Sequence, residues 1–339
     1  MSHIRLGLLV AVLVCIGCTP SVVPLPQAPV PSPTPAPPIV FPRDAWPHDG
    51  LTEWWYYTGH LRSDAGRTYG FEFVVFQVER ENAPTGYLAH LAVSDIDSQQ
   101  FSHAARFTEG QPFSNFPISV GDWTLGHDDS GESITAADSG YGLRLQLTDE
   151  KPPALHHNGY IDYGPAGGSY YYSRTRLQVS GSLDTPEGAS SHVGGIAWMD
   201  HQWGNFVVAA AGGWDWYSLQ LDDQTELMLY VLRSSTGDTT GVYGTRVLAD
   251  GSVQELSPGA VTADAVGTWT SPHTGAVYPS GWRLTLPDGA HLSLQPQLLD
   301  QELWFPEALG SAMAYWEGAV TISGDRTGLG YVELTGYAH

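Results

Sequence analysis

A single acidic residue among aromatic side chains marks residues 197–204, which read Ala-Trp-Met-Asp-His-Gln-Trp-Gly. Burial beside indole rings disfavours the charged form of a carboxyl group and raises its pKa. Asp200 could therefore keep its proton near neutral pH and act as an acid toward an apolar molecule. Its neighbour His201 is a second group that can carry a proton in this pH range. We take both as candidate catalytic residues.

Strand geometry limits what this pair can do together. Successive side chains of an extended strand point to opposite faces, so Trp198 and Asp200 share one face while His201 and Trp203 share the other. Asp200 and His201 can serve one site only if the strand bulges or breaks at Gly204. Two interpretations stay open: a catalytic pair, or a structural group of hydrogen bonds at a domain junction.

Aromatic residues surround single acids elsewhere too. Residues 53–61 place Glu53 before a run of four aromatics, and the pattern recurs at 214–216 and 315–318. Such strands most often fill cores, and the alternative is the wall of a ligand site. Alternation would also bring Arg174 and Arg176 to one face, where either could neutralise Asp200 or Glu53. The candidate ligand-binding residues are Trp55, Tyr57, Tyr172, Trp198, Trp203, Trp214 and Trp216.

Short alternating runs separated by Gly and Asp turns continue through the chain from Asp44 onward. This pattern predicts an all-β fold of antiparallel barrels, with one short helical turn within residues 300–313. An uncharged stretch after Gly204 favours a division into two domains, 44–205 and 206–339. Each is long enough for an eight-strand barrel, the size that encloses one small ligand.

The first 18 residues read as a lipoprotein signal peptide, with a short apolar run ending in Cys-Ile-Gly-Cys. We expect lipidation at Cys18; the alternative is an ordinary secretory signal cut nearby. Residues 19–43 form a linker with ten prolines, which favours an extended chain. The protein is therefore expected to be exported and anchored at Cys18 to a membrane of the bacterial cell envelope, on its periplasmic or outer side.

Charge and motifs exclude several classes of function. With 36 acidic and 14 basic residues the net charge is -22, so nucleic acid is not an expected partner. Both cysteines lie in the signal segment, which removes thiol chemistry from the folded part. His90, His156, His157 and His201 lack the spacing of a zinc motif. There is no nucleophile elbow, phosphate loop or dinucleotide fingerprint, so we expect no metal and no cofactor.

Several strings together resemble the AttH-like, carotenoid 1,2-hydratase family of lipocalin-like proteins. They are residues 53–61, 155–160, 170–177, 195–204, 213–216, 226–233 and 315–319. The resemblance implies two lipocalin-like β-barrels in tandem and hydration of a terminal isoprene double bond without a cofactor. It also implies that Asp200 donates the proton. Trp198, Trp214 or Trp216 would then stabilise the carbocation through its π face.

Three functions follow as hypotheses. The first is handling of a hydrophobic, isoprenoid- or lipid-like ligand, with acid-catalysed hydration of a terminal alkene. The second is a non-catalytic, lipid-anchored carrier that serves an ABC-type export system of the envelope. The third is a structural envelope protein with filled barrels. The presence of a ligand-sized cavity would distinguish the first two functions from the third, because filled barrels have none. The surroundings of Asp200 separate the first from the second: in an enzyme it faces the substrate, and in a carrier it forms an ion pair with Arg174 or Arg176.

Overall fold

The computed structural model describes residues 36–79, 83–163, 167–188, 190–206, 212–234, 236–305 and 313–338. Within them the only helical element is the 3₁₀ turn η1 (Arg43–Ala45), so the predicted all-β fold is confirmed. None of the helical structure in these ranges is long and apolar enough to cross a membrane. The signal peptide, Cys18 and most of the linker lie outside the described residues, and their roles stay predictions.

The first sheet contains eleven antiparallel strands in the order β4-β3-β2-β1-β11-β10-β8-β7-β6-β5, and β9 pairs with β10. Its strands are β1 (Thr52–Ser63), β2 (Thr68–Val78), β3 (Thr85–Asp95), β4 (Gln100–Gly110), β5 (Ile118–Val120), β6 (Trp123–Asp128), β7 (Gly131–Asp138), β8 (Tyr141–Asp149), β9 (Ala154–Asp162), β10 (Gly167–Asp184) and β11 (Ser190–Phe206). The long strands β1, β10 and β11 lie at its centre and carry most of the aromatic motifs.

The second sheet has the order β15-β14-β13-β12-β23-β22-β20-β19-β16, and β21 pairs with β22. Its strands are β12 (Trp214–Leu221), β13 (Glu226–Arg233), β14 (Thr239–Val247), β15 (Val253–Leu256), β16 (Thr262–Ala265), β19 (Trp282–Thr285), β20 (His291–Pro296), β21 (Glu302–Phe305), β22 (Met313–Gly324) and β23 (Gly328–Leu334). A separate hairpin joins β17 (Thr268–Thr270) to β18 (Val277–Pro279). The helical turn expected within residues 300–313 is wrong for 302–305, because these residues pair with β22. Residues 306–312 of that segment lie outside the described residues.

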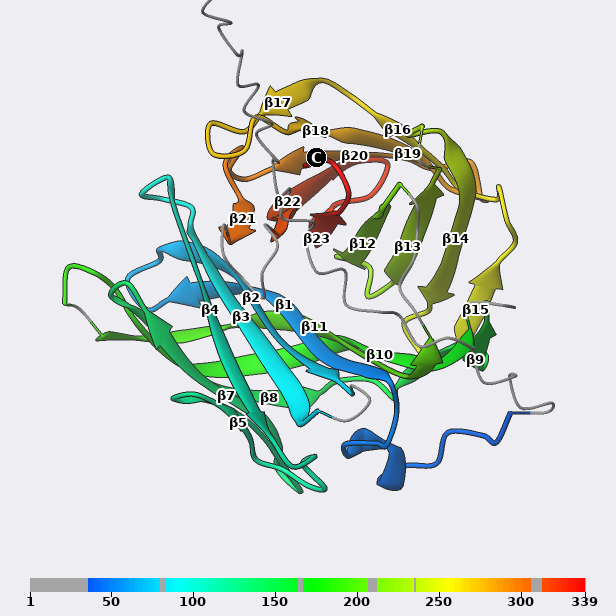
Figure 1. Cartoon of the computed structure of the whole chain (residues 1–339). Coiled ribbons are helices and arrows are strands. Elements are labelled where there is room, and N and C mark those ends of the chain that lie inside the picture. The colour runs from blue at the N-terminus through cyan, green and yellow to red at the C-terminus, as the bar shows by residue number, and fades with distance from the viewer. Residues whose placement is uncertain are drawn as a thin grey trace, which may run out of the picture.

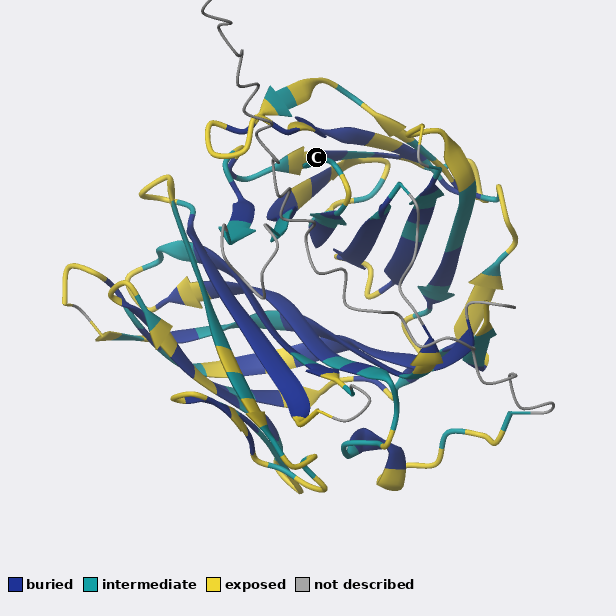
Figure 2. Ribbon diagram, viewed as in Figure 1, coloured by how far each residue is buried: buried dark blue, intermediate teal, exposed yellow. Residues whose placement is uncertain are grey.

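Each sheet curls around its own apolar core (Figure 1). The first core includes Trp55, Phe73 and Trp123, and the second includes Tyr217 and Trp282. These two curled sheets match the predicted pair of tandem lipocalin-like barrels. Figure 2 shows that the buried strands of both sheets lie toward the middle of the molecule, while exposed residues concentrate in turns and edge strands.

The outer faces of the two barrels pack against each other. β1, β2 and β10 of the first sheet contact β23, β22 and β12 of the second. A third apolar cluster lies in this junction and is called the interface cluster below. Its buried members are Tyr56, Val74, Tyr171, Trp198, Trp216, Met228, Ala319 and Tyr331. The central strands of both sheets thus have one face in a barrel core and one face in the junction.

Candidate functional site

The two candidate catalytic residues lie on opposite faces of β11. The pairing of β11 with β1 runs without a shift from Thr52–Gly204 to Ser63–Val193, so no bulge interrupts the alternation around Asp200. Trp198 belongs to the interface cluster, whereas Met199 and Trp203 belong to the core of the first barrel. Asp200 therefore faces the second barrel and His201 faces the interior of the first. They do not form one catalytic pair.

Asp200 is buried, with 4% of its surface exposed, and accepts three hydrogen bonds. Trp198 donates its indole N–H to Asp200 Oδ1 over 2.7 Å, and the hydroxyls of Tyr171 and Ser173 donate to the same carboxyl group. Within the described ranges it has no ion pair. Burial raises its pKa to about 6, although each of the three donors lowers it. The carboxyl group is therefore protonated in a substantial fraction of molecules just below neutral pH.

The two arginines do not neutralise Asp200 as the alternation would allow. The register of β10 against β11 shifts between Arg174 and Leu177, which turns Arg174 and Arg176 to different surroundings. Arg174 forms an ion pair with Asp149, and Arg176 reaches Glu226 of the second barrel over 2.6 Å. The prediction that they share one face is wrong because a single-strand bulge breaks the two-residue period.

A chain of hydroxyl and imidazole groups leads from Asp200 across the junction. Ser173 contacts His156 Nε2 over 2.7 Å, and His156 Nδ1 contacts the hydroxyl of Thr245 in the second barrel over 2.9 Å. Burial lowers the pKa of His156 to about 3, so the imidazole is neutral. Sequence reasoning considered His156 only as a metal ligand and missed this role, because the link to Ser173 depends on the pairing of β9 with β10.

Three further carboxyl groups lie at the junction: Glu317 and Glu333 on the second barrel, and Glu72 on β2 of the first. Tyr56 donates to Glu317, Trp214 donates to Glu333 over 2.9 Å, and Tyr315 donates to Glu72 over 3.2 Å. Burial raises the pKa of Glu72 to about 8 and of Glu333 to about 7, and raises that of Glu317 well above its usual value. The recurring acid among aromatics was the signal for Glu317. Glu72, between Phe71 and Phe73, carries the same signal, which sequence reasoning did not use, and Glu333 carries none.

The candidate ligand-binding residues divide into two groups. Trp198, Trp214 and Trp216 lie at the junction with Asp200, and the rings of Trp198 and Trp216 meet edge to face at 6.2 Å. The others lie inside the first barrel beside His201, and they are Trp55, Tyr57, Tyr172 and Trp203. Alternation along β11 predicted this division for Trp198 and Trp203, since neighbouring side chains of a strand point to opposite faces. The prediction of one ligand-binding set did not separate the other aromatics.

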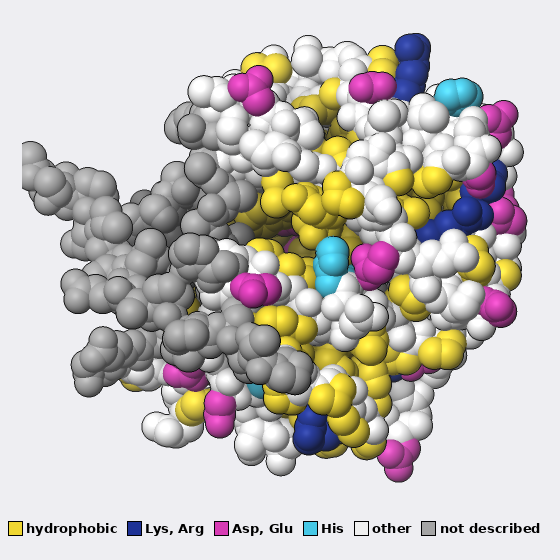
Figure 3. Space-filling view, turned by 90° about the vertical axis from the view of Figure 1, so that its right-hand side faces the viewer, with side chains coloured by type: hydrophobic (Ala, Val, Ile, Leu, Met, Phe, Trp, Pro, Cys, Tyr) yellow, Lys and Arg dark blue, Asp and Glu magenta, His cyan; other side chains and the backbone are white. Residues whose placement is uncertain are grey.

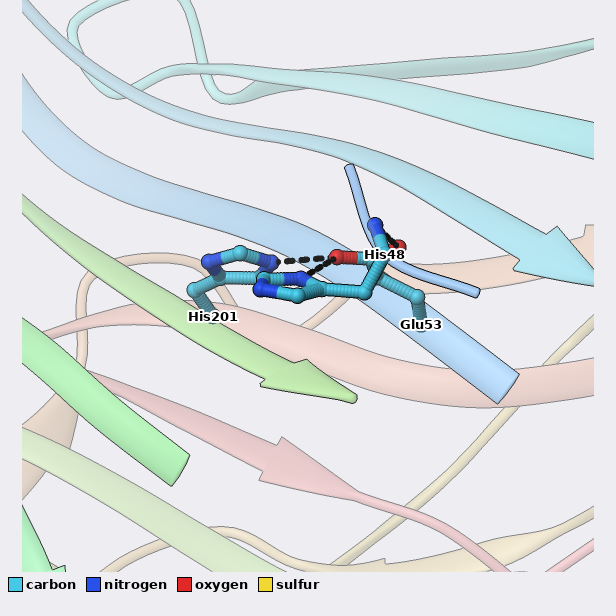
Figure 4. Close-up of side chains that lie close together, drawn as sticks. All are labelled: His48, Glu53 and His201. Carbon is cyan, nitrogen blue, oxygen red and sulfur yellow. Dashed lines mark hydrogen bonds and ion pairs between the residues drawn. The ribbon is translucent and has the colours of Figure 1, made fainter. Parts of the chain in front are cut away.

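Inside the first barrel, His201 joins a cluster with Glu53 and His48 (Figure 4). His48 Nδ1 and His201 Nε2 lie 2.8 Å and 2.7 Å from the same oxygen of Glu53. His201 Nδ1 meets the hydroxyl of Tyr172 at 3.1 Å, and His48 stacks on Trp203. Two imidazoles and a carboxylate are a donor set that zinc accepts. These spacings are those of hydrogen bonds, which identifies a hydrogen-bonded unit that holds β1, β11 and the chain before β1 together.

A hollow opens between the two barrels. Figure 3 shows hydrophobic side chains gathered around it at mid-height, on the side of the molecule that carries β9 and β15 in Figure 1. A pocket of about 290 Å³ between these two strands is lined by Pro153, Leu155, Asn158, Val253 and Glu255. It borders β9, the strand that carries His156.

Comparisons with known proteins agree with this architecture. The family model described as AttH-like matches residues 32–337. A putative AttH from Nitrosomonas europaea is 33% identical with a TM-score of 0.82, over 89% of this chain and 98% of that one. Kievitone hydratase from Nectria haematococca has the same fold at 17% identity and a TM-score of 0.72, over 88% of this chain and 93% of that one. No curated protein matches the sequence. With the family model spanning both barrels, the chain belongs to the AttH-like family.

Proposed function

We propose that this protein binds an apolar, isoprenoid- or lipid-like molecule between its two barrels and hydrates one of its carbon–carbon double bonds. The observation that carries the proposal is Asp200, a buried carboxyl group among aromatic rings with three neutral donors and no ion pair within the described residues. A carboxyl group kept partly protonated among aromatic rings can act as a general acid toward an apolar substrate.

The chemistry needs no cofactor. The proton of Asp200 forms a new C–H bond at the less substituted alkene carbon and leaves a tertiary carbocation. The faces of Trp198 and Trp216 supply negative electrostatic potential to that cation. Water then forms the C–O bond and gives up a proton, so the product is a tertiary alcohol and the carboxyl group can be reprotonated.

The shared fold supports the proposal at the level of architecture. Kievitone hydratase is named for addition of water, and it shares the two-barrel architecture at 17% identity. At this identity the likeness concerns the fold, so the proposal depends on the surroundings of Asp200. The terminal alkene of an acyclic carotenoid is the first substrate to test, because the sequence strings resemble hydratases of that class.

The direct test compares Asp200→Asn with wild type on lycopene and shorter acyclic terpenoids in water enriched in oxygen-18. Wild type is expected to produce labelled alcohol, and Asp200→Asn to lose at least about 100-fold in rate because the acid is gone. Glu302→Gln is the matched control: Glu302 is also buried and accepts three hydroxyl bonds, from Ser271, Thr274 and Tyr278. It should keep wild-type activity.

Equal rates in wild type and Asp200→Asn would contradict the hydratase proposal. Tight binding of the same molecules without any product in wild type would instead support the carrier. In that case we propose that the protein is a carrier attached to the envelope membrane through Cys18, and that it delivers its ligand to an ABC-type export system. Mass spectrometry of molecules that copurify with the full chain would identify the natural ligand for either function.

A further inference from the structure

We infer that Glu317 and Glu333 form a second proton-transfer centre, which shares one proton and accepts the proton released by the added water. This inference rests on the proposed hydration and assigns the base that the reaction needs. The pair belongs to the second barrel, and Asp200 belongs to the first.

Two cross-strand rows meet at the junction. In the second sheet, Glu317 lies directly opposite Glu333, and Glu333 lies directly opposite Trp216. In the first sheet, Asp200 lies directly opposite Tyr56. The hydroxyl of Tyr56 donates to Glu317, and the rings of Tyr56 and Trp216 meet at 5.7 Å. The acid and the carboxyl pair therefore face each other across one aromatic layer.

The surroundings of the pair favour a single shared proton. Side chains directly opposite in an antiparallel sheet have Cβ atoms about 5 Å apart, and like charges at that position destabilise each other. The donors to the pair are neutral: the hydroxyl of Tyr56 and the indole of Trp214. No cation among the described residues pairs with either carboxyl group. Two carboxyl groups in this situation do not ionise together, so one proton stays between them.

Two buried polar atoms in the same row leave capacity for a water molecule or a hydroxyl group. Glu317 is 1% exposed, and its second oxygen, Oε1, has no hydrogen-bond partner within the described ranges. The indole N–H of Trp216, which is 6% exposed, has none there either. An acceptor and a donor near one carboxyl pair are what an attacking water needs for orientation.

The proton balance of the reaction closes with this pair. Asp200 loses its O–H bond as the alkene gains a C–H bond. Water forms the C–O bond, and the resulting oxonium ion loses a proton to the singly protonated pair, which becomes doubly protonated. That proton then returns to the Asp200 carboxylate, and the net reaction is alkene plus water to alcohol.

The first experiment tests the shared proton without substrate. Infrared difference spectra of wild type against Glu317→Gln and Glu333→Gln, recorded from pH 4 to 9, should show that each variant loses one carboxylic acid C=O band that persists above pH 6 in wild type. The bands of Asp200 and Glu72 are common to wild type and variants and cancel in the difference. Glu302→Gln should leave that band unchanged. A spectrum in which both groups are ionised at pH 6 would overturn the inference, whatever wild type does with alkenes.

The second experiment separates the two proton transfers. In D₂O, reversible protonation by Asp200 puts deuterium into recovered alkene, and only the later step yields alcohol. Glu317→Gln and Glu333→Gln should keep deuterium exchange and lose alcohol formation by about 100-fold with KM within twofold, whereas Asp200→Asn should lose both. If both glutamate variants form alcohol at the wild-type rate, the inference is overturned. No exchange and no alcohol in wild type would instead overturn the proposed function and leave the pair structural.

Discussion

Asp200 has the character of an acid because its partners are neutral. Burial raises its pKa and each donor lowers it, so the value of about 6 reflects a balance that single donors can change. The protonated form of Asp200 predominates below that pH, and the protonated fraction falls about tenfold per pH unit above it. The rate of the proposed hydration should therefore decrease with rising pH above about 6.

Trp198→Phe tests this balance at the level of one hydrogen bond. The ring remains, but the 2.7 Å N–H bond to Asp200 is lost, so the pKa of Asp200 should rise above 6. The alkaline limb of the pH–rate profile should move to higher pH. Trp282→Phe is the matched control, because the buried indole N–H of Trp282 has no partner in the described ranges. A limb that does not move with Trp198→Phe would contradict the assignment of that limb to Asp200.

The sequence predicted the acid and the face it shares with Trp198, because both depend only on residue type and the two-residue period of a strand. It did not predict which face looks into a barrel. It also did not identify Tyr171 and Ser173 as the donors. Those facts depend on how β10 and β9 pair with β11 and with each other, and long-range register is not encoded in local alternation.

At the scale of elements, the bulge in β10 decides where charges are placed. Regular alternation would leave Arg176 beside Arg174, whereas the shift sends Arg176 across the junction to Glu226. Lys151 also reaches Glu226 over 2.7 Å, so one buried carboxylate serves two cations. The strands themselves were predictable from alternation, and the bulge was not, because no local turn residue marks it.

Glu226→Gln should destabilise the protein by about 3 kcal/mol, since it leaves Arg176 and Lys151 buried without a counter-charge. Urea unfolding of wild type and variant measures the difference. Asp184→Asn is the control, because its ion pair with Arg144 is partly exposed to solvent and should contribute less than about 1 kcal/mol. Similar losses in both variants would contradict a special role for the junction pair.

The fit between β2 and the second barrel is equally specific. A Cβ atom at Gly70 would lie 2.4 Å from the hydroxyl oxygen of Tyr331 and 2.9 Å from Cβ of Ala319. Gly70→Ala should therefore cost about 1–3 kcal/mol in the free energy of unfolding. Gly110→Ala, where nothing lies within 4 Å, should be nearly neutral. Equal stability of the two variants by thermal unfolding would show that the barrels can shift apart without cost.

For the whole molecule, the junction makes stability depend on pH in an unusual direction. Glu72, Glu333 and Asp200 have pKa values of about 8, 7 and 6 in the folded state, all above their ordinary values. A group whose pKa is higher in the folded state stabilises the folded protein fully at pH values below its unfolded-state pKa. This contribution is lost as the pH rises through its folded-state pKa. These three carboxyl groups thus hold more protons in the folded protein than in the unfolded chain between about pH 4 and 8. The buried histidines His60, His90 and His156 have lowered pKa values and hold fewer protons in the folded protein below about pH 6.5, so the carboxyl groups dominate above that pH.

The free energy of unfolding should accordingly decrease from about pH 6.5 to pH 8, by about 1.4 kcal/mol per pH unit for each excess proton. Denaturant titrations at several pH values measure this slope. Glu72→Gln should flatten the curve at its upper end, between about pH 7 and 8, because its group titrates last. A stability that rises over this range would show that the junction carboxyl groups are ionised.

The last strand in the chain, β23, pairs with β12 at the middle of the second sheet, whereas the first sheet is complete once β11 has formed. A chain that stops before β12 contains every strand of the first sheet but leaves the aromatic outer surface around Trp198 uncovered. Exposed apolar surface of this kind promotes association between chains. The first barrel made alone should therefore aggregate more readily than the whole chain, because the second barrel is the cover of that surface.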